Sequence, residues 1–200
     1  MKERGMIFNG EMVRAILDGR KSQTRRPVKF PVIDKNMGCE LAGNKLAGEL
    51  AAGSYWNSPF GKPGDRIWVR ETFGDCGERL VYRADTDDGA KCKVKRWTPS
   101  IHMPRWASRL TLEITGVRVE RLNGISETDA ESEGIDMEAL NDSQDCYDCI
   151  ADHNMTGRPT VTGAFKYLWE SIYGEENWQA NPWVWVIEFK VVPYVQDNPT

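Results

Sequence analysis

The chain has 200 residues, of which 40% are hydrophobic and 28% are charged, and its formal net charge is −4. This ordinary globular composition excludes disorder as the default state, and the length suits one domain with insertions. The longest apolar run, residues 183–187, is too short to cross a bilayer, and residues 1–11 lack the apolar core of a signal peptide. We therefore expect a cytoplasmic protein that has no membrane partner.

Charge is distributed unevenly along the chain. Residues 14–29 hold six Lys or Arg residues and one acid, and residues 91–109 hold six Lys or Arg residues and no acid. Residues 127–152, in contrast, hold ten Asp or Glu residues and no base. Two basic stretches that fold together would form a local groove for anions despite the negative total, whereas either stretch alone is equally typical of a solvated face.

The first predicted element is a short helix. Asn9 is a typical N-cap, apolar residues follow at helical spacing, and Gly19 ends the helix in a left-handed conformation. The basic segment GRKSQTRR, residues 19–26, therefore begins where this helix stops. Residues 34–58 are rich in Gly, Ala and Asn and are predicted to form a long loop with a short helix near residues 45–51.

Strands are predicted next. The turn GKPGD at residues 61–65 leads into a strand over residues 66–73, and residues 80–83 are expected to pair with that strand as a hairpin arm. Residues 109–122 alternate apolar and polar side chains, and Gly116 is the expected site of a bulge or bend.

Two helices and a final strand complete the prediction. Ser126, followed by Asp129, resembles a capping box and opens an acidic helix. Thr162 is expected to cap a second helix, which ends at Gly174 and has an apolar stripe of Phe165, Leu168, Trp169 and Ile172. The last strand, residues 183–189, is apolar on both faces and should lie centrally in a sheet.

These elements predict an α+β fold built as a mainly β barrel with peripheral helices. Several non-adjacent strands, few helices and the absence of a βαβ rhythm favour this architecture. We expect a single domain over residues 1–200, with long insertions at about 34–58, 87–108 and 141–162.

The order of the elements resembles the ASCH domain, a branch of the PUA-like β-barrel superfamily. The resemblance rests on the initial helix, GRKSQTRR, the strand sequence PGDRIWV, the strand near residues 110–122, the acidic helix and the final VWVIEF. The segments SIHMPRWASR and NPWVWVIEF are similar to segments of the larger ASCH proteins of bacteriophages and prophages. The resemblance implies recognition of nucleosides, nucleotides, RNA or DNA. For one compact bacterial branch it implies an amidohydrolase that removes the acetyl group from the exocyclic amine of acetylated cytidine.

The compact amidohydrolase supplies candidate catalytic residues. Its sequence Gly-Arg-Lys-Thr-x-Thr-x-Arg is matched here from Gly19 to Arg26, with Ser22 in place of the first threonine. Its acidic-helix sequence Ala-Glu-x-Glu is matched by Ala130, Glu131 and Glu133. The resemblance therefore implies that Lys21, Thr24 and Glu133 are catalytic. The long insertions depart from the compact pattern and would enlarge, re-aim or cover the pocket.

Amide hydrolysis needs a nucleophile, a proton acceptor for that nucleophile and a proton donor for the leaving amine. Thr24 is the candidate nucleophile, and Lys21 is the candidate base if its pKa falls from about 10.4 to about 7–8. Burial lowers the pKa of a lysine, and so do neighbouring cations, here Arg20, Arg25 and Arg26. A carboxylate raises it, so Glu133 is assigned to orienting water or returning a proton. Residues 21 and 24 face opposite sides of a strand, so both reach one substrate only from a turn or bulge.

The same residues also suit binding without catalysis. The cations Arg20, Arg25 and Arg26 can contact phosphate, the hydroxyls of Ser22 and Thr24 can contact base edges, and a carboxylate can accept from an exocyclic amine. A non-catalytic RNA- or DNA-binding domain and a phage interaction protein without a nucleotide ligand therefore stay open as alternatives.

Two further groups are candidates for nucleic-acid binding. Trp97 and Trp106 lie among basic residues that include Arg105, and they either stack on bases or pin a long loop to the fold. Arg70 and Glu71, at the end of a predicted strand, either line the pocket or form an ordinary ion pair.

The cysteines are predicted to be thiols without a metal. Their odd number, five, fits a reducing compartment better than a disulfide framework. Cys146, Cys149 and His153 offer three potential zinc ligands, but a structural zinc site usually needs a fourth. We therefore predict no metal and no cofactor.

Overall fold

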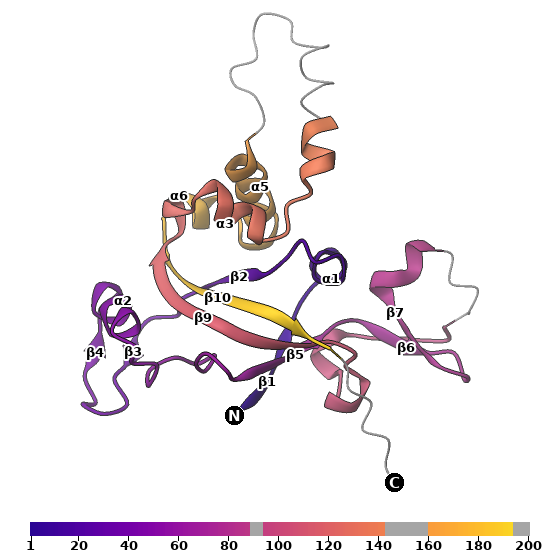
Figure 1. Ribbon diagram of the computed structural model, residues 1–200, viewed down its shortest axis with the longest axis horizontal. Coiled ribbons are helices and arrows are strands. Elements are labelled where there is room, and N and C mark those ends of the chain that lie inside the picture. Colours follow the sequence, from indigo (N-terminus) through magenta and orange to yellow (C-terminus); the bar gives the residue numbers. More distant parts are fainter. Residues whose placement is uncertain (89–93, 143–159, 194–200) are drawn as a thin grey trace, which may run out of the picture. The chain divides into compact units, whose positions relative to one another are not determined.

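The structure is a computed structural model that describes residues 1–88, 94–142 and 160–193. It combines a five-stranded sheet, a two-stranded sheet and a three-stranded sheet with several helices (Figure 1). The α+β class predicted from the sequence is confirmed. The observed strand pairings do not require the sheet to close into a barrel.

The five-stranded sheet has the strand order β1-β5-β9-β10-β2. Its members are β1 (Glu3–Ile7), β5 (Arg66–Arg70), β9 (Thr111–Arg121), β10 (Trp183–Val192) and β2 (Gln23–Pro27). β1 pairs in parallel with β5, with Glu3 opposite Arg66, and β5 pairs antiparallel with β9, with Arg66 opposite Glu113. β10 lies between β9 and β2, so the prediction of a central final strand is confirmed.

The chain separates into two compact units. Unit 1 comprises Met1–Gly19, Ser58–Val117 and Glu188–Thr200, and unit 2 comprises Arg20–Asn57 and Arg118–Ile187. β9 and β10 each contribute residues to both units. This division does not test whether the chain folds as one domain, which stays a prediction.

Unit 1 begins with β1 and α1 (Gly10–Leu17). The side chain of Asn9 accepts a hydrogen bond from the backbone N–H of Met12 at 2.8 Å, and Gly19 has a φ of 75°. Both ends of the predicted helix are therefore confirmed. The helix buries Val13, Ala15 and Ile16, so its apolar stripe packs into the core.

The predicted strand at residues 66–73 is interrupted. β5 ends at Arg70, and a separate strand, β6 (Phe73–Asp75), follows after a break of two residues. β6 lies between β7 (Leu80–Tyr82) and β8 (Trp97–Thr98) in the three-stranded sheet. The predicted hairpin arm therefore pairs with β6 and not with β5. The described 3₁₀ segments of unit 1 are η1 (Arg83–Asp88), η2 (Ser100–His102) and η3 (Arg105–Ala107).

Gly116 has a packing role in β9. The strand continues through this position from Thr111 to Arg121. A Cβ atom at Gly116 would lie 2.5 Å from Oε2 of Glu188, so the flexible end of the Glu188 side chain would have to shift to admit a larger residue. The glycine leaves room for this close approach of Glu188, which the sequence did not predict.

Unit 2 contains a small hairpin and most of the helices. β3 (Val32–Ile33) pairs antiparallel with β4 (Glu40–Leu41), and α2 (Gly43–Ala51) follows, as predicted near residues 45–51. The other elements are η4 (Leu122–Gly124), α3 (Glu127–Ser132), a helical turn at residues 137–142, α5 (Val161–Tyr173) and α6 (Glu175–Gln179). A cluster of buried apolar side chains, including Leu122, Phe165, Trp169, Val184 and Val186, forms the core of this unit.

The caps of the unit 2 helices confirm one prediction and correct another. The hydroxyl of Ser126 accepts from the backbone N–H of Asp129 at 3.1 Å, as expected for the start of α3. α5 is capped by Thr160 and not by Thr162: the Thr160 hydroxyl accepts from the N–H of Gly163 at 3.0 Å. Thr162 lies inside the first turn, because the chain enters the helix two residues earlier than the sequence pattern indicated.

Candidate functional site

Lys21 and Glu133 form a buried ion pair in unit 2. The ammonium of Lys21 donates to the Oε2 atom of Glu133 at 2.8 Å and to the main-chain oxygen of Glu133 at 2.7 Å. The two side chains are 0% and 3% exposed. The structure therefore brings together two predicted catalytic residues that lie 112 positions apart in the sequence.

Backbone pairing fixes this contact. Lys21 and Glu133 form an isolated antiparallel β-bridge, and the N–H of Ser22 donates to the main-chain oxygen of Ser132 at 2.9 Å. Glu133 is the C-cap residue of α3, whose start is set by Ser126. The helix end and the segment before β2 are thus joined by main-chain contacts, which hold the two side chains in register.

Arg25 extends the pair into a larger cluster. Its Nη1 atom donates to Oε1 of Glu133 at 3.1 Å, and its Nη2 atom donates to Glu120 at 2.6 Å and to Asp129 at 3.1 Å. Arg118 donates to Glu120 at 3.1 Å and to both carboxylate oxygens of Asp129 at 3.0 Å. We call these residues the unit 2 ion cluster; its three cations and three carboxylates are Lys21, Arg25, Arg118, Glu120, Asp129 and Glu133.

Strand periodicity explains how the unit 2 ion cluster is assembled. Side chains two residues apart on a strand share a face, which places Gln23 and Arg25 together on β2 and Arg118 and Glu120 together on β9. The Oε1 atom of Gln23 accepts from Arg118 at 3.3 Å, so the faces of these two strand segments are in contact. The carboxylate of Asp129 reaches the same cluster from the first turn of α3.

The cause of the pKa shift differs between Lys21, at the centre of the unit 2 ion cluster, and Asp129, at its edge. Burial lowers the pKa of Lys21, and the charges of Arg26 and Arg25 add to this effect, while Glu133 opposes it. Burial raises the pKa of Asp129, but the guanidinium groups of Arg118 and Arg25 outweigh it and bring this pKa below 3.8. A lysine whose pKa is lowered can exchange a proton more easily at neutral pH than a lysine in water.

Thr24, the third predicted catalytic residue, is buried in β2. Strand alternation places it on the face opposite to Gln23 and Arg25. No contact among the described residues joins it to Lys21 or Glu133. Residues 23–27 are regular strand, so the turn or bulge that the sequence argument required is not at this position.

Three further predicted binding residues lie next to the unit 2 ion cluster. Arg20 donates from Nη1 to the main-chain oxygen of Gly134 at 3.0 Å, and it is half-buried. Ser22 is exposed, and Arg26 is half-buried within β2. The polar side chains of segment 19–26 are therefore divided between buried, paired groups and groups at the surface.

Arg70 and Glu71, two other candidates, belong to unit 1. Glu71 accepts from Nε and Nη2 of Arg109 at 2.9 Å and 3.0 Å, and Arg109 also donates to Asp85 at 2.7 Å and 2.9 Å. Burial raises the pKa of Glu71 above 4.5, and Asp85 adds to this, although Arg109 opposes it. We call Arg109, Glu71 and Asp85 the unit 1 ion cluster. Arg70 donates to the main-chain oxygen of Ile101.

Glu71 also lines a cavity of about 630 Å³ in unit 1. The N-terminal end of α1 and the side chains of Arg14 and Arg83 contribute to the same cavity. Glu71 thus forms an ion pair, with Arg109. The cavity that it lines contains neither Lys21 nor Glu133, so its predicted place in the nucleotide pocket stays a prediction.

The predicted stacking residues of unit 1 differ in their surroundings. The guanidinium carbon of Arg83 lies 5.7 Å from the ring centre of Trp97, so this indole already has a cation on its face. Trp106 is 75% exposed in η3. The Nε and Nη2 atoms of Arg105 each donate to Glu3 at 2.9 Å. Of the two tryptophans, Trp106 offers the more open aromatic surface.

Sequence reasoning missed the three outer members of the unit 2 ion cluster. Asp129 was recognised only as part of a capping sequence, and Arg118 and Glu120 only as polar positions of an alternating strand. Their signal was the alternation itself, because it places both charges on one face of β9. The partners of Arg118 and Glu120 depend on tertiary contacts with α3 and β2, which the sequence pattern does not indicate.

The cysteines bear out the thiol prediction only in part. Cys39 is a free thiol, whereas Cys76 is disulfide-bonded, so the expectation of reduced cysteines is wrong at Cys76. Cys146, Cys149 and His153 lie outside the described residues. Within residues 1–88, 94–142 and 160–193, no group of three or more His, Cys, Asp or Glu side chains is arranged to hold a metal ion. Every helix in those same ranges is too short or too polar to cross a membrane.

Comparisons with known proteins give similar solved structures at low sequence identity. No protein-family model and no curated protein matches the chain. An ASCH domain from Lactobacillus crispatus is similar over 95% of this chain and 79% of that chain, at 15% identity and a TM-score of 0.39. The protein EF3133 from Enterococcus faecalis V583, of family DUF984, is similar over 100% and 86%, at 12% identity and a TM-score of 0.39. The hypothetical protein PH0355 is similar over 95% and 99%, at 15% identity and a TM-score of 0.37.

Proposed function

We propose that this chain is an ASCH-type protein that recognises a nucleobase or nucleotide and hydrolyses an acyl group on the exocyclic amine of cytosine. The observation that carries the proposal is the buried contact of 2.8 Å between the Lys21 ammonium and the Glu133 carboxylate. The resemblance in sequence had implied both residues independently of any contact between them.

The chemistry assigns a different task to each member of the pair. A water molecule attacks the acyl carbon, the carbon–nitrogen bond breaks, and the products are a carboxylic acid and the free exocyclic amine. Within the pair, the Lys21 ammonium first passes a proton to the Glu133 carboxylate along their hydrogen bond, a transfer that the burial of Lys21 favours because it lowers the pKa of this lysine. The neutral Lys21 amine then accepts the proton of the attacking water, and Glu133 gives its proton to the leaving amine, which restores the ammonium and the carboxylate.

Unsatisfied donors in the unit 2 ion cluster and on the adjacent Gln23 support a ligand that carries acceptor atoms. An ammonium has three N–H donors, and the described contacts of Lys21 use two of them. The Nε2 atom of Gln23 and the Nε atom of Arg25 are buried and lack an acceptor among the described residues. Carbonyl oxygens of a base or of its acyl group would satisfy such donors, and so would a phosphate.

Turnover of acetylated cytidine by the wild-type protein, followed by chromatography of the deacetylated product, tests the proposal. Lys21→Met should abolish turnover, and Glu133→Gln should reduce it strongly, with folding of each variant checked by thermal melting. Lys29→Met removes an exposed cation from the same basic segment and is the matched control, which should keep full activity. Absence of product from folded wild-type protein at high enzyme concentration would overturn the catalytic proposal.

Thr24→Val separates two routes of attack. If Thr24 is the nucleophile, as the sequence resemblance implies, the variant should lose turnover as completely as Lys21→Met. If water attacks directly, Thr24→Val should retain most of the rate, because Thr24 faces away from Gln23 and Arg25.

Binding without catalysis is the second candidate function. The observation that favours it is the complete burial of the Lys21 side chain, which keeps the ammonium from bulk solvent and suits a structural support for a binding surface. In that case, the wild-type protein should bind oligonucleotides with an affinity that falls steeply as salt increases, and acetylated cytidine should persist. Failure of both assays would favour the interaction-protein alternative.

A further inference from the structure

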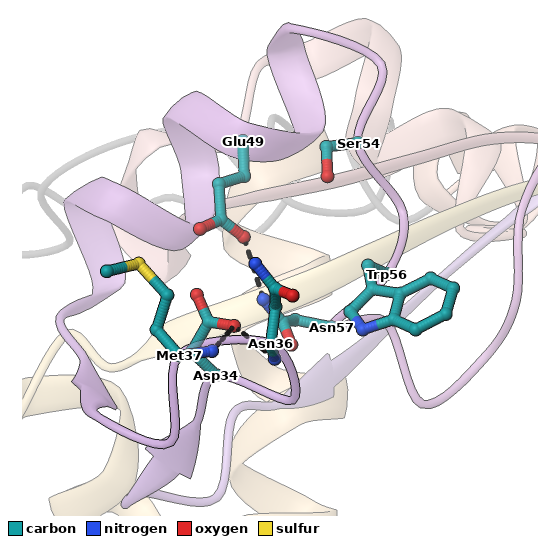
Figure 2. A pocket seen from close by; sticks show the side chains of 7 residues that line it. All are labelled: Asp34, Asn36, Met37, Glu49, Ser54, Trp56 and Asn57. Atoms are coloured by element: carbon teal, nitrogen blue, oxygen red, sulfur yellow. Dashed lines mark hydrogen bonds between the residues drawn. The ribbon is translucent and has the colours of Figure 1, made fainter.

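A cavity of about 500 Å³ lies in unit 2 within the long insertion at residues 34–58. It is bordered by the turn after β3, by α2 and by the segment that follows α2 (Figure 2). Its volume falls in the range of ordinary ligand pockets, about 300–1,000 Å³. None of the residues of the unit 2 ion cluster lines it, so it is a separate candidate site.

Two carboxylates face this cavity without a cationic partner among the described residues. The Oδ1 atom of Asp34 accepts from the backbone N–H groups of Asn36 and Met37 at 2.7 Å and 3.1 Å. The Oε2 atom of Glu49 accepts from the side-chain amide of Asn57 at 2.9 Å. All of these donors are neutral, so the negative charge of both carboxylates remains available to a ligand.

The same cavity has an exposed apolar border. Trp56 is 68% exposed and Met37 is 75% exposed, although both are large apolar side chains. In Figure 2, Glu49 reaches from α2 toward the turn that carries Asp34, and Trp56 lines the same cavity from the segment after α2, with Asn36 and Asn57 drawn between its indole and the two carboxylates. An indole face attracts cations through its quadrupole, and the carboxylates attract them through their negative charge. Both surfaces of the cavity therefore favour a cationic ligand.

The loop that presents Trp56 is held in place by its own hydrogen bonds. The Lys35 ammonium donates to the main-chain oxygen of Trp56 at 2.8 Å, and the backbone N–H of Lys35 donates to Oδ1 of Asn57 at 3.0 Å. These contacts fix the backbone beneath the indole and leave its ring exposed. Backbone N–H groups, chiefly those of Asn36 and then Met37, also hold the pKa of Asp34 below 3.8, so this carboxylate stays charged in mildly acidic solution.

We propose that this cavity binds a guanidinium group, which stacks on the indole of Trp56 and donates hydrogen bonds to the carboxylates of Glu49 and Asp34. Guanidinium is planar and weakly hydrated, stacks on aromatic faces and pairs with carboxylates through two parallel N–H donors. A phosphate or a nucleic-acid backbone would be repelled by the two carboxylates. The site is thus distinct in ligand class from the proposed nucleotide site.

Fluorine NMR of protein labelled with 5-fluorotryptophan tests the inference. The resonance of Trp56 is assigned by its loss in Trp56→Phe, which is needed because the chain has eight tryptophans. Titration with ethylguanidinium should shift this resonance saturably. The control cation n-butylammonium should bind more weakly, because it is not planar enough to stack on the indole and cannot donate two parallel hydrogen bonds to a carboxylate.

Variants define the contribution of each surface. Glu49→Gln should weaken binding about fivefold, since it replaces a charge-assisted hydrogen bond by a neutral one. Trp56→Leu, followed by calorimetry, should weaken it about two- to fivefold. Glu40→Gln removes an exposed carboxylate that does not line the cavity, and it should leave binding unchanged.

A further titration, with a short arginine peptide, identifies the source of the guanidinium group. If acetyl-Gly-Arg-Gly-amide binds more tightly than ethylguanidinium, the ligand is an arginine of a polypeptide; if it binds more weakly, the ligand is a free small cation. The inference is overturned if ethylguanidinium causes no saturable shift, if n-butylammonium binds as tightly, or if Glu40→Gln weakens binding as much as Glu49→Gln.

Discussion

The two ion clusters of this protein show how burial and ion pairing act in opposite directions on the pKa of a carboxylate. In the unit 2 ion cluster, three cations meet three carboxylates, and the central side chains of Lys21, Arg25 and Glu133 are almost wholly buried. In the unit 1 ion cluster, one cation, Arg109, is shared by Glu71 and Asp85. The pKa of Asp129 is lowered because two arginines outweigh its burial, whereas the pKa of Glu71 is raised because burial outweighs one shared arginine.

This comparison teaches that the number of arginines on a carboxylate decides its charge state as much as depth does. Asp129 is near the edge of its cluster and keeps its charge readily. Glu71 is buried and holds its proton more strongly. Four changes test the comparison, and they are ordered by the size of the expected effect.

Glu133→Ala should have the largest effect on stability. It leaves the buried charges of Lys21 and Arg25 without their shared carboxylate, and breaking a buried pair in this way costs about 3–5 kcal/mol. The free energy of unfolding from urea titration measures the loss. Glu133→Gln retains an acceptor and should be destabilised less; equal stability of Glu133→Ala and wild type would show that the cluster is not formed in solution.

Glu71→Gln should have an intermediate effect. Arg109 keeps Asp85 as a partner, so its charge is not left alone, and we expect a loss of about 1–2 kcal/mol in unfolding free energy. The same urea titration at about pH 4 provides the measurement, because the contribution of Glu71 is present below its ordinary pKa of 4.5. A loss as large as that of Glu133→Ala would mean that the unit 1 ion cluster depends on Glu71 as strongly as the unit 2 ion cluster depends on Glu133.

The pH dependence of stability should have opposite signs at the two carboxylates. The pKa of Asp129 is lowered from 3.8, so its stabilising contribution is present above 3.8 and is lost as the pH falls through the folded-state pKa. The pKa of Glu71 is raised from 4.5, so its contribution is present below 4.5 and is lost as the pH rises through the folded-state pKa.

Unfolding free energies of wild type, Asp129→Asn and Glu71→Gln between about pH 3 and pH 7 check these signs. The difference between wild type and Asp129→Asn should shrink as the pH falls, and the difference between wild type and Glu71→Gln should shrink as the pH rises. The same trend in both variants would contradict the assignment of burial as the main influence on Glu71.

Arg105→Ala should have the smallest effect. Arg105 and Glu3 form an ion pair in unit 1, but their side chains are 45% and 36% exposed. Exposed pairs contribute little because water and salt screen them, so we expect a loss of at most about 1 kcal/mol, and less at high salt. Thermal melting at two salt concentrations measures it, and a loss that does not change with salt would point to packing instead of charge.

Local signals predicted the elements that depend on neighbours in the sequence. Asn9 and Gly19 placed the ends of α1, and the apolar residues of 183–189 placed a strand in the centre of the sheet. Local signals failed where the local pattern does not fix the end of an element. The break between β5 and β6 and the choice of Thr160 over Thr162 as cap both depend on how each segment packs.

The candidate site was predictable only in part. Resemblance to a family motif indicated Lys21 and Glu133, and the structure places them in contact. Arg118 and Glu120 gave no individual signal, because a charged residue in an alternating strand gives the same sequence pattern whether its side chain is exposed to solvent or paired with another charged side chain. Trp56 and Glu49 lie in an insertion that was predicted to be a long loop with a short helix near residues 45–51, and no local signal indicated that the two side chains share a cavity.

The amino-acid sequence by itself determined the helix ends at Asn9, Gly19 and Ser126 and the strand at residues 183–189, because caps, turns and side-chain periodicity act over a few residues. Only the tertiary structure decided which charges are paired and which remain available to a ligand. That decision depends on desolvation and on distances between residues more than a hundred positions apart, as in the contact of Lys21 with Glu133. These quantities exist only once the chain has folded.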